Sequence, residues 1–259
     1  MPAPRVSAQL QPQHSDWPAM RRAWNEAEAL GVDCVFNWDH FYPLSADADG
    51  PSFEALTVVA AMAEVTERVE IGSLVHCNSY RNPDYLADAY RTIDHISGGR
   101  ALLGIGAGWF ERDYDEYGYE FGTVGRRITA LEHALPRIEA RWPKLNPPPQ
   151  RERIPILIGG GGVKRTLKLV ARHANIWHAF GSVDVYREKS AILADHCADE
   201  GRDPAAIEHS WAIGSRMGDD PDALLEAGVS HMIMGISGSA SGYDLAPLRE
   251  LVEWRAALR

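Results

Sequence analysis

The feature of this sequence that most constrains its fold is an alternation, repeated eight times, between a short apolar run and a segment with helical periodicity. Short apolar runs bounded by turn residues are typical of buried strands, and the segments between them have the length and periodicity of helices. The predicted strands span Arg5–Gln11, Cys34–Trp38, Val69–Val75, Ala101–Ile105, Ile154–Ile158, Ile176–Ala179, Ile207–Ile213 and Val229–Ile236. The predicted helices follow them over residues 16–30, 52–66, 83–97, 128–142, 163–173, 185–199, 221–226 and 246–257.

This order predicts parallel strands joined by right-handed crossovers. Eight strand-helix units in a chain of 259 residues, 45% of them apolar, indicate one domain over residues 1–259 with the α/β architecture of a (β/α)8 barrel, or TIM barrel. An open doubly wound sheet is the alternative, although it would need fewer strands. We interpret the triple proline at 147–149 as part of a shortened insertion before the fifth strand.

Charge and composition limit the partners and the location that we expect. The formal net charge of −10 argues against nucleic acid and against an anionic membrane surface. No apolar run approaches membrane-spanning length, and residues 1–13 contain no signal-peptide core. The three cysteines, Cys34, Cys77 and Cys197, are spaced too widely for a zinc motif. We therefore expect a cytoplasmic, reduced protein that holds no metal.

The fifth predicted strand ends in four consecutive glycines, Gly159 to Gly162. Backbone N–H groups in such a run can converge on an anion at the positive end of the next helix, with Lys164 and Arg165 nearby. This pattern favours a phosphate site. The alternative is a tight turn that needs positive φ angles, which one or two glycines would satisfy.

A second glycine pattern begins within the fourth predicted strand and continues after it, where Gly104, Gly106 and Gly108 are spaced two apart. On a strand they share one face, and this spacing predicts a groove in which a flat ring could approach the backbone. An equally good interpretation is that small residues fit a crowded barrel interior.

Four motifs carry a resemblance to a known family. They are NWDHFYP at 37–43, IGSLVHCNSYRNP at 71–83, DHISGGRALLGIGAGWFERDYDEYG at 94–118 and IPILIGGGGVKRTLKLVARHANIWHAFG at 154–181. In this order they resemble the luciferase-like monooxygenase superfamily, specifically its actinobacterial branch of oxidoreductases that use the deazaflavin coenzyme F420. The resemblance implies a barrel that holds the ring at the carboxyl ends of its strands and the coenzyme phosphate at the glycine-rich turn.

Carried over residue by residue, the resemblance places a coenzyme site along four strand ends. It implies a backbone bulge at Ser73-Leu74, where family members often have a non-proline cis peptide bond. The coenzyme-binding residues that it implies are Asp39, Ser73, Leu74, Val75, His76, Asn78, Gly106, Ala107, Gly108, Gly160, Gly161, Gly162, Ala179 and Phe180.

His40 is the predicted catalytic residue, because histidine titrates near neutral pH and can move a proton while the deazaflavin moves a hydride. Asp39 could orient it, and the alternative is a histidine that only binds a loop carbonyl. His76 could do the same work or bind the ring. Trp109, at a position where the sugar-phosphate dehydrogenase branch has a glutamate, and Tyr114 are predicted to line the substrate pocket, with Tyr114 in a lid.

We therefore predict a coenzyme F420-dependent oxidoreductase that transfers a hydride to or from an activated C=C or C=O group of a small organic molecule. One alternative is an FMN-dependent monooxygenase supplied with reduced flavin by a separate reductase, and another is a non-catalytic flavin-binding or deazaflavin-binding protein. The resemblance also implies a homodimer.

Overall fold

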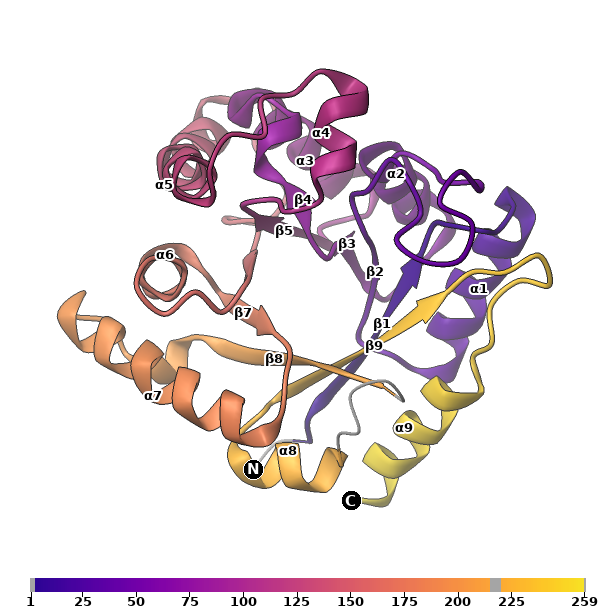
Figure 1. The fold of residues 1–259 in the computed structure, drawn as a ribbon. Helices are drawn as coiled ribbons and strands as arrows, with labels where there is room; N and C mark the ends of the chain where they lie inside the picture. The colour runs from indigo at the N-terminus through magenta and orange to yellow at the C-terminus, as the bar shows by residue number, and fades with distance from the viewer. Residues whose placement is uncertain (1–2, 215–219, 259) are drawn as a thin grey trace.

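The computed structural model describes residues 3–214 and 220–258, and it forms the predicted (β/α)8 barrel (Figure 1). Its parallel strands are β1 (Arg5–Gln11), β2 (Cys34–Asn37), β3 (Glu70–Ser73), β4 (His76–Cys77), β5 (Ala101–Gly106), β6 (Ile156–Gly159), β7 (Ile176–Ala179), β8 (Glu208–Ile213) and β9 (His231–Ser237). Strand β9 pairs with β1 from Arg5 opposite His231 to Gln11 opposite Ser237, and β3 pairs with β5. These pairings close the sheet, so the barrel prediction is confirmed and the open sheet is excluded.

The helices surround the strands (Figure 1). They are α1 (Trp17–Leu30), α2 (Ala55–Val65), α3 (Pro83–Ile96), α4 (Glu111–Tyr117), α5 (Val124–Arg141), α6 (Thr166–His173), α7 (Val183–Asp199), α8 (Pro221–Ala227) and α9 (Ala246–Ala257). Their ends follow local chemistry. The Asp16 side chain accepts a hydrogen bond from the Ala19 N–H at the start of α1, and Gly31, with φ of 88°, ends that helix in the left-handed conformation.

The third strand departs from its predicted form. Sequence pattern predicts one strand from Val69 to Val75, whereas the structure divides it into β3 and β4 around a cis peptide bond between Leu74 and Val75. The bulge implied by the resemblance is therefore present, with the cis bond one residue later than Ser73-Leu74.

Three connections carry structure that the sequence pattern did not predict. Helix α4 lies in the loop after β5, and short 3-10 turns cover Asn78–Tyr80 and Trp142–Lys144. The predicted short insertion before the fifth strand runs from Trp142, whose indole N–H donates to the Ala87 carbonyl, to a strand that begins at Ile156. Because α4 follows β5 directly, it covers the carboxyl end of the barrel near the second and third strands.

The interior of the barrel is filled by side chains. Apolar residues from five strands pack at its centre, namely Phe36, Leu102, Leu157, Ile176 and Ile233. At the amino-terminal end of the strands, the Arg5 guanidinium contacts Glu70 and Glu208, and Arg151 contacts Glu70 from outside the strands. The amino-terminal end of the barrel interior is thus occupied by an ion-pair cluster, and the interior has room for a deep site at its carboxyl end.

Helices long and apolar enough to cross a membrane are not found among the described residues.

Candidate active site

A cavity of about 530 Å3 lies at the carboxyl ends of the strands; we call it the strand-end cavity. It brings together most of the residues that sequence analysis selected: Asp39, His40, Leu74, Val75, His76, Gly106, Ala107, Gly108, Trp109, Gly160, Gly162, Ala179 and Phe180. Residues from widely separated parts of the chain therefore meet here, as a barrel requires of its strand-end loops.

His40 is held in this cavity by Asp113, a residue of α4. The His40 Nδ1 lies 2.8 Å from Asp113 Oδ2, and the Asp113 side chain is fully buried. Asp113 also accepts hydrogen bonds from the Phe41 and Tyr42 N–H groups and from the Tyr80 hydroxyl. A carboxylate with these donors is an acceptor toward His40, so Nδ1 carries the proton and Nε2 is left as the unprotonated nitrogen.

Aromatic rings surround His40 on three sides. The ring centres of Trp38, Trp109 and Phe110 lie 5.4, 5.6 and 5.5 Å from the imidazole, each at a steep angle to it. These rings restrict rotation of the imidazole and exclude water from its flanks. Trp109 itself is 63% exposed, so it forms the rim of the cavity rather than its floor.

Asp39 has a different role from the one predicted. Its carboxylate receives two hydrogen bonds from Arg81, at 2.6 and 2.9 Å, and one from the Cys77 N–H at 2.9 Å. Although burial opposes ionisation, Arg81 and His76 hold the pKa of Asp39 well below its usual range. Asp39 thus fastens β2 to β4 instead of orienting His40, and Arg81 is engaged there and with Glu54 rather than free for an anion.

His76 is also a structural residue in this arrangement. It is fully buried, its Nε2 lies 2.9 Å from the Tyr90 hydroxyl, and its Nδ1 lies 3.4 Å from Asp39. Burial lowers the pKa of His76 in spite of the neighbouring carboxylate. With both nitrogens facing protein groups, His76 is poorly placed for proton transfer, and the prediction that it could replace His40 is not supported by the geometry.

The glycines after the fourth predicted strand make room for protein atoms. A Cβ at Gly104 would lie 2.0 Å from the Ser73 carbonyl oxygen, and one at Gly106 would lie 2.8 Å from Val75 Cγ2. At Gly108, with φ of 80°, it would meet the Tyr114 hydroxyl and Cys77 Sγ. Because Gly104 and Gly106 have no side chains, the bulge at Leu74-Val75 can pack against their backbone. Val75 also lines the cavity. The crowded-interior interpretation is the one that the structure favours.

The glycine-rich turn lies at the other end of the cavity, before α6. Gly160 has φ of 131°, which only glycine adopts readily, and a Cβ at Gly162 would lie 2.8 Å from Thr166 Oγ1. The Lys189 ammonium of α7 approaches Gly161, within 2.4 Å of the place where a Cβ would be. Arg165 turns away to Thr129 and Glu132 of α5. Lys189 is therefore a cation beside this turn, whereas the Arg165 guanidinium is engaged on α5.

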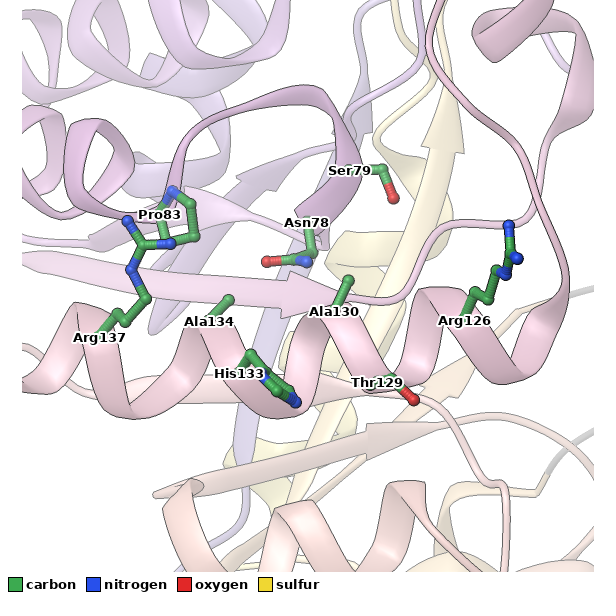
Figure 2. Close-up of a pocket in the computed structure, with 9 residues that line it drawn as sticks. All are labelled: Asn78, Ser79, Pro83, Arg126, Thr129, Ala130, His133, Ala134 and Arg137. Carbon is green, nitrogen blue, oxygen red and sulfur yellow. The ribbon is translucent and has the colours of Figure 1, made fainter.

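Four predicted site residues lie outside the lining of this cavity. Tyr114 is fully buried against Cys77, Sγ to hydroxyl 3.0 Å, because α4 packs onto the barrel instead of forming an open lid. Ser73 is fully buried next to the bulge, and Gly161, between the lining residues Gly160 and Gly162, is not itself among the lining residues. Asn78 lines a separate groove of about 530 Å3 between α5 and the start of α3 (Figure 2).

In the described parts of the chain, 3–214 and 220–258, no group of three His, Cys, Asp or Glu side chains is arranged to hold a metal ion.

Sequence reasoning missed three residues that shape the site: Asp113, Lys189 and Gln9, which lines the cavity from β1. Gln9 carried a signal, since it lies at an inward position near the end of a predicted strand. Asp113 and Lys189 lie 73 and 28 residues from the groups they approach, so no local spacing pointed to them.

The model of the luciferase-like monooxygenase family matches residues 3–256. The chain therefore belongs to the luciferase-like monooxygenase family. An uncharacterized protein of Mycobacterium tuberculosis (strain ATCC 25618 / H37Rv) is 28% identical over 185 residues, which cover 62% of this chain and 64% of that protein. An F420-dependent glucose-6-phosphate dehydrogenase of Intrasporangium calvum is 28% identical over 223 residues, covering 79% of this chain and 63% of that enzyme. The chain spans less than two thirds of the length of these relatives.

Solved structures share the fold over more of the chain. An F420-dependent secondary alcohol dehydrogenase in complex with an F420-acetone adduct superposes with a TM-score of 0.83 at 18% identity, covering 99% of both chains. A riboflavin lyase with modified FMN and riboflavin superposes with a TM-score of 0.69 at 15% identity, covering 81% of this chain and 62% of the lyase. At these identities the likeness shows a common fold.

Proposed function

We propose that this protein is an F420-dependent oxidoreductase that transfers a hydride between the deazaflavin and a carbonyl or activated alkene, or the corresponding alcohol or alkane, of a small organic molecule. The observation that carries the proposal is the pairing, in one cavity, of a glycine-rich turn beside Lys189 with a histidine fixed by a buried carboxylate. The family match and the F420-dependent relatives support it.

The residues present fit such a coenzyme. A phosphate would be held by the backbone of Gly160, Gly161 and Gly162 and by the Lys189 ammonium, since glycine N–H groups before a helix favour an anion. A flat ring would lie along Val75 and the backbone of Gly106 to Gly108, where the cavity is largely apolar. When bound, the deazaflavin supplies or accepts the hydride.

The protein's own contribution is to place the substrate and to move the second hydrogen as a proton. During oxidation, the unprotonated His40 Nε2 is suited to take a proton from an alcohol, and during reduction the imidazolium form gives its Nε2 proton to a carbonyl oxygen. Asp113 stabilises the imidazolium that forms in the second direction, because its carboxylate lies 2.8 Å from Nδ1. The surrounding rings of Trp38, Trp109 and Phe110 keep water from competing for this proton.

Titration of the purified protein with F420 and with FMN, followed by the change in each coenzyme's absorption or fluorescence, tests this proposal. We expect saturable binding of F420 with an affinity at least about tenfold above that for FMN. Transfer of deuterium from C5-labelled reduced F420 to a ketone panel would then demonstrate turnover. Preference for FMN would support the monooxygenase alternative. Coenzyme binding without deuterium transfer to any ketone, or to any activated alkene in a second panel, would support the non-catalytic one.

The homodimer and the separate reductase stay predictions. Sedimentation velocity would show whether the protein is a homodimer. A separate reductase is expected only if FMN is the preferred coenzyme.

A further inference from the structure

A second chamber of about 500 Å3 adjoins the strand-end cavity, over the ends of β1, β8 and β9. Residues that line both spaces are Gln9, Trp38, Leu44, Leu74, His178 and Ala212. The two spaces are therefore lobes of one cleft, and a molecule in the second chamber lies beside whatever occupies the first.

A ladder of polar side chains crosses the floor of the second chamber. The Ser237 hydroxyl donates to Gln11 Oε1, the Gln11 amide nitrogen lies 3.4 Å from Gln9 Oε1, and the Gln9 amide donates to the Leu74 carbonyl at 2.5 Å. The ladder thus runs from β9 across β1 to the bulge that borders the strand-end cavity. Both glutamines are inward-facing residues of β1, two apart on the same face of the strand.

These contacts leave hydrogen-bonding capacity directed at the chamber. A primary amide has two N–H donors and an oxygen with two acceptor positions, and the ladder uses one donor of each glutamine. The remaining groups of Gln9 and Gln11 lie at a half-buried surface, where a ligand hydroxyl or carbonyl can replace water.

The chamber lacks cationic side chains among the described residues that line it. Asp244 is the charged residue there, and its carboxylate also caps the start of α9 by accepting from the Ala246 N–H. His178 is neutral near pH 7, because burial and the neighbouring His231 lower its pKa to about 3. A phosphate or carboxylate placed in this chamber would meet an acidic side chain and neutral amides, which disfavours anionic ligands.

Gly235 keeps the chamber open. It is paired with Gln9 in the β1–β9 ladder, and a Cβ there would lie 3.5 Å from both Gln9 Oε1 and Gln11 Nε2, an ordinary contact distance. A small side chain would fit at this position and a large one would fill the space above the ladder. Gly235 lines the second chamber and not the strand-end cavity.

We propose that the second chamber is the substrate subsite and that it takes an uncharged molecule. Beside the carbonyl or alcohol that reacts, this molecule carries a further hydroxyl or carbonyl group that binds the Gln9 and Gln11 amides. The inference rests on the proposed function, because it places the substrate next to the coenzyme.

Saturation-transfer NMR with hydroxyacetone and hydroxyacetone phosphate tests the chamber, using the whole protein with and without F420. We expect hydroxyacetone to bind at least about tenfold more tightly than its phosphate ester. We expect Gly235→Leu to weaken hydroxyacetone binding by at least about tenfold, whereas Gly235→Ala changes it less than about threefold. Gln11→Leu removes the amide without filling the chamber, and we expect this variant to bind hydroxyacetone more weakly as well.

A separate F420 titration of the same variants keeps the two proposals distinct. Gly235→Leu should bind F420 as the unaltered protein does, which also shows that the variant is folded. If the unaltered protein does not bind F420, the proposed function is overturned, and the NMR result alone decides whether the second chamber binds an uncharged ligand. Tighter binding of the phosphate ester, no binding of hydroxyacetone, or equal hydroxyacetone binding by Gly235→Leu would overturn the substrate assignment.

Discussion

The imidazole of His40 and the carboxylate of Asp113 form a buried pair, Nδ1 to Oδ2 2.8 Å, that joins the loop after β2 to helix α4. Asp113 is not among the residues that line the strand-end cavity. Under the proposed function it is therefore a positioning residue that acts through His40. The pair fixes which imidazole nitrogen carries the proton.

Replacing His40 with alanine should leave F420 binding within about twofold and lower turnover by about 10²–10⁴-fold, the usual contribution of a positioned proton donor. The measurement is single-turnover hydride transfer with the coenzyme bound in advance. Undiminished transfer would show that His40 is only a wall of the cavity.

Replacing Asp113 with asparagine should lower the same rate by a similar factor, because an amide N–H facing Nδ1 moves the imidazole proton to Nε2. The decisive measurement is the double variant with His40→Ala. If Asp113 acts through His40, the double variant loses no more than about threefold beyond the larger single loss. Losses that multiply would mean that Asp113 acts independently, for example by holding the loop at Phe41 and Tyr42.

The glycine-rich turn is tested by charge. Gly161→Asp places a carboxylate beside Lys189 and should lower F420 affinity by at least about 100-fold, whereas Gly161→Ala should have a smaller effect.

Lys189→Met should weaken F420 binding by about tenfold or more, which corresponds to one charge-assisted hydrogen bond. Lys168→Met removes an α6 ammonium that lies 3.8 Å from Glu200, and this control variant should bind F420 normally. Equal affinity in Lys189→Met would place the coenzyme phosphate elsewhere.

The crowding at the bulge predicts an effect on stability rather than on binding. Gly104→Ala should lower the free energy of unfolding by about 1–3 kcal/mol, because the new methyl group would overlap the Ser73 carbonyl. Gly125→Ala, at an exposed position in α5 with no atom closer than 3.8 Å, should instead raise it by about 0.5–1 kcal/mol. Urea unfolding of the two variants gives this comparison, and a Gly104→Ala protein as stable as the unaltered chain would contradict the packing argument.

His178 predicts a loss of stability in acid. Its pKa is about 3 in the folded protein, while an unfolded histidine titrates near 6.5. The unfolded chain therefore binds a proton that the folded chain excludes, and stability falls as the pH drops from about 6.5 toward 3, by up to about 1.4 kcal/mol per pH unit.

His178→Gln retains a partner for Ser210 and should flatten this dependence between about pH 5 and 6.5, where most carboxylates stay ionised. His133→Gln, at an exposed position of α5, should not change the slope. Parallel slopes in the unaltered protein and His178→Gln would show that His178 accepts a proton while folded.

Sequence periodicity was sufficient for the barrel, because buried parallel strands are continuous apolar runs and the helices between them have apolar faces. Helix α4 escaped prediction since ERDYDEY is short and has no apolar stripe. The glycine spacing at 104–108 predicted a close approach to this strand but not what approaches it. The segment that fills the space, the Leu74-Val75 bulge, is distant in sequence. Sequence also assigned Asp39, the neighbour of His40, as the residue that orients it, whereas Asp113 does so in the structure. Adjacency in sequence does not fix the direction of a side chain, and Asp113 is distant in sequence.

The ion pairs of Arg5 with Glu70 and Glu208, with the apolar side chains packed above them, close one end of the barrel. Molecules therefore enter the cleft from the carboxyl ends of the strands, where both of its lobes open. If the proposed function holds, coenzyme and substrate share this entrance, and product-inhibition patterns would show whether one of them must bind first.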